Sequence, residues 1–91
     1  QGALLELVQS LNADPEVDGI LVQDPLPPHL DIREVQEAVD PAKDVDGFHP
    51  VNVGRLWNGE RALIPCTPAG LIRMMDHYKL RIAGKRAVIV G

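Results

Sequence analysis

The sequence is poor in cysteine, in basic residues and in long apolar runs. Its single cysteine, Cys66, excludes an internal disulfide and suits a reducing cytosol, so a cytoplasmic location is expected. No apolar run approaches the roughly 18–20 residues of a membrane span, and the first residues lack a signal-peptide pattern. The formal net charge of −4 argues against nucleic acid or an anionic membrane as the main partner.

What the chain does contain is typical of a globular protein. Hydrophobic residues make up 45% of its 91 residues and charged residues 24%, which fits one small domain with a modest core. The chain has no initiator methionine, its first residues have a helical pattern, and residues 87–91 have that of a strand. We therefore expect it to be an internal piece of a longer protein.

Three helices are predicted from apolar spacing and capping signals. Apolar residues on one helical face predict a helix over residues 2–12. The capping-box spacing of Asp31 and Glu34 predicts a second helix over residues 32–39. Thr67, followed by a proline, favours a third helix with threonine as N-cap and proline as its first residue, ending near residue 79.

Two strands are predicted between and after these helices. Residues 17–23 and 87–91 contain short apolar runs without alternation, which is typical of strands buried on both faces of a parallel sheet. The intervening residues 41–66 are rich in glycine and proline and are expected to be mostly loop. The order of elements predicts an α/β fold with a mostly parallel sheet.

Polar residues at the end of the first strand and in the following loop are candidates for a binding site. Gln23 lies at the carboxyl end of a predicted parallel strand, where open sheets bind ligands; alternatively it caps the strand's own backbone groups. Asp44 and Asp46 are two residues apart, so their side chains should diverge. One is expected to anchor the loop and the other to face a ligand; the alternative is a solvated acidic turn.

No metal site is expected from the histidine and cysteine positions. His29, His49 and Cys66 match no zinc-binding spacing. Cys66 precedes a predicted helix start, where a thiol can be reactive, but we favour a small buried residue that packs the turn.

Four segments occur in the order and at the spacing of one family's motifs. They are Val-Gln-Asp-Pro-Leu-Pro at 22–27, Pro-Ala-Lys-Asp-Val-Asp-Gly-Phe at 41–48 with Asn52 and Gly54, Pro-Cys-Thr-Pro-Ala-Gly at 65–70, and the strand at 84–91 that ends in glycine. Together they resemble the motifs of the bifunctional methylenetetrahydrofolate dehydrogenase/methenyltetrahydrofolate cyclohydrolase family, and the resemblance covers almost the whole chain.

The resemblance implies an activity and a domain organisation. Such enzymes oxidise 5,10-methylenetetrahydrofolate with NADP, or NAD in some members, and hydrolyse the methenyl product to 10-formyltetrahydrofolate, in one-carbon metabolism and purine biosynthesis. Residues 1–83 would belong to the folate-binding catalytic domain with its linking helix. Residues 84–91 would be the first strand of a Rossmann-like dinucleotide-binding domain, with a cleft between the two domains. A homodimer is implied as well.

The resemblance also assigns roles to six residues of this chain. Asp46 would hold the pterin edge and Gln23 would hydrogen-bond the catalytic lysine, so these two are the candidate catalytic residues and both contact substrate. The other four would line the ligands: Val22 and Pro25 the pterin slot, and Thr67 and Gly91 the dinucleotide.

Two features depart from the family's pattern. The catalytic lysine of the family lies upstream of this chain and Lys43 does not match its position, so the 91 residues alone are expected to be inactive. Asp24 stands where the family has leucine, and a charge beside the pterin slot needs a partner or solvent. Asp24 is the support for an alternative, a non-catalytic folate-binding module; a structural α/β piece is a third interpretation.

Overall fold

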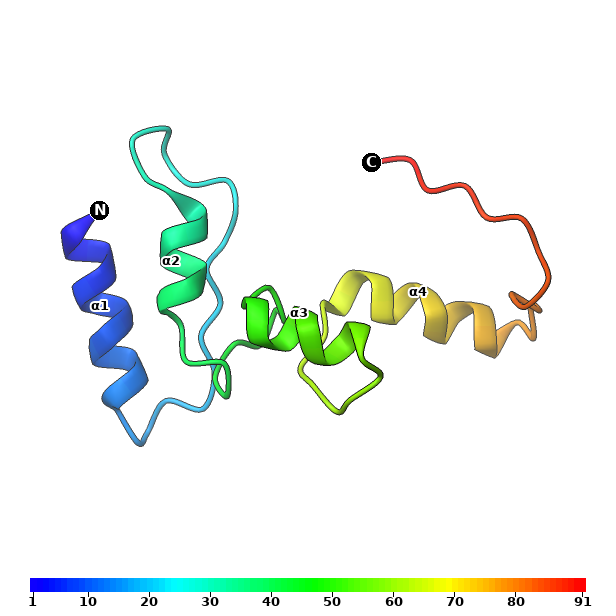
Figure 1. The fold of residues 1–91 in the computed structure, drawn as a ribbon, viewed down its shortest axis with the longest axis horizontal. Helices are drawn as coiled ribbons and strands as arrows, with labels where there is room; N and C mark the ends of the chain where they lie inside the picture. Colours follow the sequence, from blue (N-terminus) through cyan, green and yellow to red (C-terminus); the bar gives the residue numbers. More distant parts are fainter.

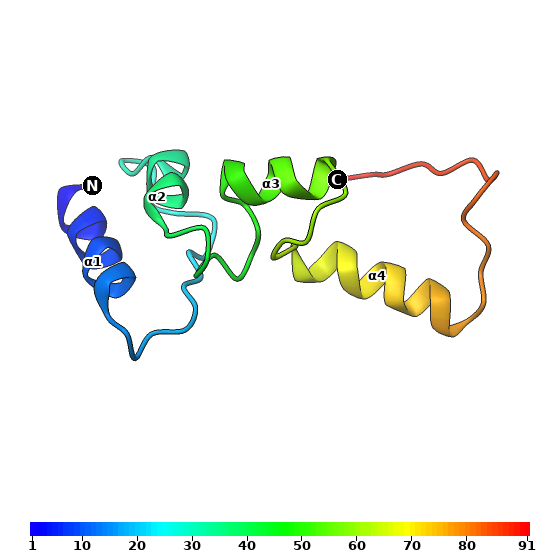
Figure 2. The same cartoon turned by 60° about the horizontal axis from the view of Figure 1, so that its bottom comes forward.

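The computed structural model describes all 91 residues. It contains four helices and no strand. The helices are α1 (Gly2–Ala13), α2 (Ile32–Ala38), α3 (Pro50–Trp57) and α4 (Cys66–His77). Figure 1 and Figure 2 both show α1 and α2 side by side, with α3 and α4 extending the molecule away from them. The radius of gyration is 15.9 Å, against about 12 Å for a compact domain of this length. None of the helices has the length and hydropathy needed to cross a membrane.

A core of four aliphatic residues joins α1, α2 and the segment between them. Val8 of α1 and Val35 of α2 are buried, as are Ile20 and Val39. This core is smaller than the composition predicted, because the apolar side chains of α4 and of residues 88–90 remain exposed. The extended shape explains the difference, since no other part of the chain covers those faces.

The first two predicted helices are confirmed, but the capping box of α2 is only half formed. The Asp31 carboxylate accepts a hydrogen bond from the Arg33 backbone N–H at 2.9 Å. Glu34 accepts from the Gln1 side chain at 2.6 Å, and the Asp31 backbone N–H donates to the Gln1 side chain at 3.1 Å. Gln1 therefore takes the place of Glu34 in the box and ties the start of α1 to the start of α2.

Helix α4 begins earlier than predicted. Its first residue is Cys66 and its N-cap position is Pro65, so Thr67 is not the cap and Pro68 is the third helical residue. Proline is tolerated there because the first-turn N–H groups of a helix have no partner within the helix. The Thr67 hydroxyl is therefore not used to cap the helix.

Helix α3 lies in the region predicted to be loop. Its N-cap is His49, whose Nδ1 accepts a hydrogen bond from the Val51 backbone N–H at 3.1 Å, and Pro50 is its first residue. The sequence prediction missed this helix because histidine is not among the usual capping residues and Gly54 is a poor helix former.

Neither predicted strand forms, so the parallel sheet is not confirmed. Residues 17–23 make one parallel bridge, between Ile20 and Asp44. The Ile20 N–H donates to the Lys43 carbonyl at 2.7 Å, and the Val45 N–H donates to the Ile20 carbonyl at 3.4 Å. A strand needs a neighbour along its length, and the chain supplies one at this point only. Residues 86–91 make no backbone hydrogen bond at all.

Lys43 fastens the bridge to the end of α1. Its Nζ donates to the backbone carbonyls of Leu11, Asn12 and Asp14 at 3.0, 2.7 and 2.8 Å. The last carbonyls of a helix lack partners, and a cation near them also complements the helix dipole. The Asn12 side chain adds two hydrogen bonds to the backbone at residues 38–40. The end of α1 is thereby joined to the segment that leads to Asp44.

We expect Lys43→Met in the full-length protein to lower the free energy of unfolding by about 1–3 kcal/mol. The substitution removes the charged donor that three backbone carbonyls at the end of α1 share, and methionine keeps the aliphatic part of the side chain. Denaturant unfolding followed by circular dichroism measures the change. Lys79→Met, at an exposed lysine with no side-chain hydrogen bond, is the control and should stay within about 0.5 kcal/mol of wild type. Equal loss in both variants would contradict the anchoring role of Lys43.

Candidate active site

Three segments of the chain meet around one cleft of about 280 Å³. The segment after the bridge, the loop that follows Asp44, and the start of α4 each form one wall. The lining residues are Leu21, Gln23, Asp46, Phe48, Pro65, Cys66, Thr67 and Pro68. Small-molecule pockets usually span about 300–1,000 Å³, so this cleft fits one ring system and not a whole folate with a dinucleotide. Gln23, Asp46 and Thr67, predicted from separate motifs, thus share one site.

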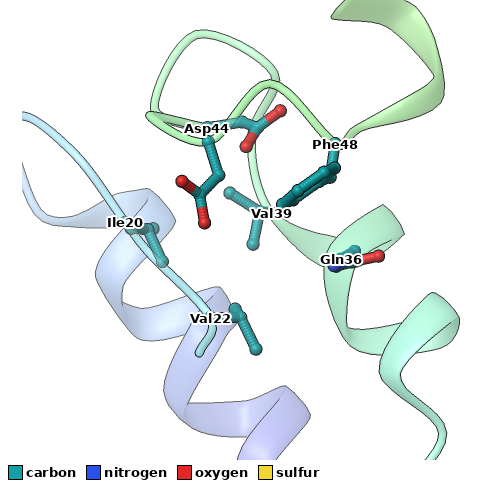
Figure 3. Close-up of a pocket in the computed structure, with 7 residues that line it drawn as sticks. Ile20, Val22, Gln36, Val39, Asp44 and Phe48 are labelled. Atoms are coloured by element: carbon teal, nitrogen blue, oxygen red, sulfur yellow. The ribbon is translucent and has the colours of Figure 1, made fainter. Parts of the chain in front are cut away.

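A narrow crevice adjoins this cleft, and the two spaces share Asp46 and Phe48 as lining residues. Figure 3 shows Phe48 and Asp44 on one side of it and Ile20 and Val22 on the facing segment. It holds about 10 Å³, which is room for no more than one water-sized probe. Asp46 and Phe48 line both spaces, whereas Val22 lines only the crevice. The structure therefore places Val22 in the crevice and not on the cleft.

The two aspartates of the loop have separate environments, as predicted. Asp44 is buried, and its carboxylate accepts from the Gly47 N–H at 3.0 Å, from the His49 N–H at 2.8 Å and from the Asn52 side chain at 3.0 Å. Asp46 is half-buried at the cleft, and its carboxylate makes no hydrogen bond within the chain. Asp44 anchors the loop, so a solvated turn is wrong for that residue. The carboxylate oxygens of Asp46 are therefore available to accept hydrogen bonds from a ligand.

Gln23 lines the cleft with one half of its amide still unpaired. Its Nε2 donates to the Asp24 carbonyl at 2.8 Å, so the capping alternative describes one of its functions. Its Oε1 accepts no hydrogen bond within the chain. The Asp24 side chain is exposed, and solvent meets the need for a partner that its charge creates. Pro25 is exposed too and is not among the residues that line the cleft or the crevice.

The two residues predicted to lie beside a dinucleotide differ in where the structure places them: Thr67 lines the cleft and Gly91 does not. Thr67 is exposed in the first turn of α4, on the cleft. Gly91 is exposed, and a Cβ placed there would meet no atom within 4 Å. The 91 residues contain no glycine-rich turn between a strand and a helix, the feature that binds a pyrophosphate. Of these two residues, Thr67 lies on the cleft, and the role of Gly91 stays a prediction.

Some lining residues were missed or misjudged from the sequence. Phe48 faces both the cleft and the crevice; the available signal was its place two residues after Asp46 in a chain with only three aromatic residues. Cys66 is exposed on the cleft, so the expectation of a buried packing residue is wrong. The reason is that α4 begins at Cys66, which places it on the open first turn. No three His, Cys, Asp or Glu side chains gather in a metal-binding arrangement.

Residues 1–46, just over half of the chain, match the family model described as tetrahydrofolate dehydrogenase/cyclohydrolase, catalytic domain. The chain belongs to this family. The predicted resemblance is thereby confirmed. Asp44 and Asp46 fall at the end of the matched region, so the match includes the anchored loop up to its candidate ligand-binding carboxylate.

Members of the tetrahydrofolate dehydrogenase/cyclohydrolase family with curated sequences match over almost all of the chain. The bifunctional protein FolD of Thermus thermophilus is 61% identical over 89 residues, which is 98% of this chain and 32% of that protein. The FolD protein of Campylobacter hominis is 53% identical over 91 residues, which is 100% of this chain and 32% of that protein. The chain spans about a third of the length of these relatives.

Solved structures of the family contain the same arrangement of helices. The bifunctional FolD methylenetetrahydrofolate dehydrogenase/cyclohydrolase of Campylobacter jejuni superposes with a TM-score of 0.94 at 47% identity, over 100% of this chain and 33% of that one. A 5,10-methylenetetrahydrofolate dehydrogenase of the silkworm Bombyx mori superposes with a TM-score of 0.84 at 40% identity, over 87% and 27%. The elongated shape of these 91 residues thus occurs inside larger folded members of the family.

Proposed function

We propose that the full-length protein oxidises 5,10-methylenetetrahydrofolate to the 5,10-methenyl compound with NADP and hydrolyses that compound to 10-formyltetrahydrofolate. The observation that carries the proposal is that Gln23, Asp46 and Thr67 line one cleft in a chain of this family. NADP is preferred to NAD on the resemblance alone. The curated relatives are named bifunctional, which supports assigning both steps to one site.

The proposal includes the setting of the enzyme. It would be a cytoplasmic homodimer of one-carbon metabolism and purine biosynthesis, with tetrahydrofolate derivatives as partners and neither nucleic acid nor membrane. Residues 1–83 would belong to the catalytic domain, and residues 84–91 would open the Rossmann-like domain. The extended segment at 86–91 is compatible with this division because it makes no backbone hydrogen bond with the rest of the chain.

Asp46 would bind the pterin ring at the edge away from the reacting carbon. Its carboxylate is half-buried and has no partner within the chain, so it can accept two parallel hydrogen bonds from adjacent ring N–H groups. Phe48 and Val22 provide apolar surface beside it. Holding the ring in this way positions the bridging carbon without touching it, and such positioning supplies much of the catalysis when two rings must meet.

Gln23 would orient a general acid/base lysine contributed from outside these 91 residues. The free Oε1 of Gln23 can accept a hydrogen bond from an ammonium group while its Nε2 stays bound to the Asp24 carbonyl. Lys43 is excluded from that role, because its Nζ is held by three carbonyls at the end of α1. The lysine would move the protons that accompany attack of water on the methenyl carbon.

NADP, when bound, accepts the hydride that leaves the bridging carbon. Thr67 and Gly91 would lie beside it, Thr67 through a hydroxyl that caps no helix N–H group.

The proposal is tested by two assays on the purified full-length protein. In the first, 5,10-methylenetetrahydrofolate and NADP should give NADPH and the methenyl compound; in the second, supplied methenyl compound should disappear faster than without enzyme. Tight binding of 5-formyltetrahydrofolate without either reaction would instead support the non-catalytic folate-binding module, for which Asp24 is the argument. Absence of both binding and turnover would overturn the proposal.

For Gln23→Leu we expect a loss of about 10²-fold in the cyclohydrolase rate with little change in NADP binding. The leucine keeps the volume of the side chain but removes the acceptor that orients the lysine, and a misdirected acid/base group typically costs 10²–10⁴-fold. Methenyl hydrolysis and the NADP dissociation constant are measured on the same preparation. Gln9→Leu, at an exposed glutamine on α1, is the control. A changed NADP affinity with normal hydrolysis would contradict the assignment.

A further inference from the structure

Asn52 is one of the most deeply buried polar residues of the chain, with 1% of its surface exposed. We propose that Asn52 is a positioning residue, which acts through Asp44 to hold Asp46 at the pterin edge. The inference rests on the proposed function and adds to it a residue that touches neither folate nor the dinucleotide.

The Asp44 carboxylate closes the loop that carries Asp46. One oxygen accepts from the Gly47 N–H at 3.0 Å and the other from the His49 N–H at 2.8 Å. The backbone is therefore folded back onto Asp44 at two points beyond Asp46. Charge-assisted hydrogen bonds of this kind are short and strong, so the arc between residues 44 and 49 has a defined course. Asp46 lies in the middle of that arc, with a side chain that the rest of the chain does not hold.

Asn52 supplies the only side-chain donor to this carboxylate. Its Nδ2 donates to Asp44 Oδ2 at 3.0 Å and to the Pro41 carbonyl at 2.8 Å. The Asn52 amide thus links the Pro41 carbonyl, at the start of this loop, to the buried carboxylate of Asp44. No buried side-chain nitrogen or oxygen in the structure lacks a hydrogen-bond partner, so the network has no spare donor that could replace Asn52.

Asn52 can help to hold Asp44 because the start of α3, the helix that carries Asn52, is joined to α2. The imidazole of His49 accepts from the Val51 N–H through Nδ1, so its Nε2 carries the proton and donates to the Glu37 carbonyl at 3.2 Å. This contact docks the start of α3 against the end of α2. The third residue of α3 is Asn52, which therefore presents its amide to Asp44 from a helix whose start is joined to α2.

Loss of the Asn52 amide would affect folate binding because it would loosen the loop that carries Asp46. Without the Asn52 amide, Asp44 Oδ2 keeps only the His49 N–H. The Asp44 carboxylate is then no longer tied to α3 and to the Pro41 carbonyl, so the arc that it closes can shift with it. A displacement of about 1 Å in a group that positions a reacting ring can cost on the order of 10²-fold in rate. The loss should fall on folate and spare the dinucleotide, because Thr67 belongs to α4, a different wall of the cleft from the loop that carries Asp46.

The test is Asn52→Ala in the full-length protein, with 5-formyltetrahydrofolate as the folate probe. Calorimetry should show its dissociation constant raised about tenfold or more, while the NADP dissociation constant changes less than about twofold. KM for 5,10-methylenetetrahydrofolate should rise with it. In a double-mutant cycle, Asp44→Ala and Asp44→Ala/Asn52→Ala should bind the probe equally, because Asn52 acts through Asp44.

Two further results separate positioning from general destabilisation. Lys43→Met, which loosens the chain at the end of α1, should reduce stability without changing the affinity for 5-formyltetrahydrofolate. If Asp44→Ala does not fold, the comparison of Asn52→Ala with Lys43→Met at equal fraction folded decides the matter. Normal folate affinity in Asn52→Ala, or equal loss of folate and NADP affinity, would overturn the proposal. A wild-type protein that binds no folate would instead overturn the proposed function and this inference with it.

Discussion

Replacing Asp46 with alanine in the full-length protein should lower kcat/KM for 5,10-methylenetetrahydrofolate by at least about 10²-fold. Two charge-assisted hydrogen bonds to the pterin edge would be lost, each worth about 1.5–3 kcal/mol, and every 1.4 kcal/mol is tenfold. Both the dehydrogenase and the cyclohydrolase rates should fall, because both steps need the same ring held in the same place. Steady-state kinetics of the two reactions measure the effect.

The control for Asp46 is another carboxylate in the same half of the chain. Asp18→Ala removes an exposed acid two residues before the bridge, in a segment that leads to the cleft, and makes the same change in net charge. It should leave both rates within about twofold of wild type, since an exposed residue away from the site has little effect. Wild-type folate affinity in Asp46→Ala, or a loss equal to that of Asp18→Ala, would remove Asp46 from the site.

Gly47→Ala should destabilise the full-length protein by about 2–5 kcal/mol and reduce folate turnover. A Cβ at this position would lie 2.6 Å from the Leu63 carbonyl oxygen and 2.9 Å from the Ile64 Cα, both backbone atoms that cannot rotate away. The residue also has φ of +70°, where an alanine costs about 1–2 kcal/mol, and overpacking adds about 1–3 kcal/mol. Denaturant unfolding and steady-state kinetics give the two quantities.

Gly59 offers a matched control for this substitution. Its φ of +73° is close to that of Gly47, but a Cβ there would meet nothing within 4 Å. Gly59→Ala should therefore show the conformational cost alone, and the difference between the two variants isolates the contact with residues 63–64. Because that segment leads into α4, only Gly47→Ala should also disturb the wall that carries Thr67. Equal losses in the two variants would mean that the contact has no energetic role.

Local signals in the sequence were sufficient for the first two helices. Apolar residues at helical spacing around Val8 pack on α2, so the face that the sequence period predicted to be apolar is the face that the structure packs against the core. They were insufficient for α3, whose cap is a histidine that becomes useful only when its other nitrogen reaches the Glu37 carbonyl. The predicted strands failed for a similar reason, because pairing depends on a neighbour and residues 17–23 have one only at Asp44.

The candidate site was predictable in its residues and less so in its geometry. The family's motifs named Gln23, Asp46 and Thr67, and spacing alone indicated that the two aspartates would separate into an anchor and a free carboxylate. The resemblance assigned the ligand-facing role to Asp46, and the donors that surround Asp44 show how the other aspartate anchors the loop. The burial of Asn52 was likewise invisible, because its partners lie eight and eleven residues away across a turn and a bridge.

The small core has a thermodynamic consequence for the whole protein. With seven of 91 residues buried, unfolding this region by itself would expose little new surface, so its own heat-capacity change and denaturant m-value would be small. A sharp, cooperative melting transition in the full-length protein would then have to be generated largely by surfaces that α3, α4 and residues 88–90 bury against other parts of the protein. The cleft between Gln23, Asp46 and Thr67 would take its rigidity from that wider transition.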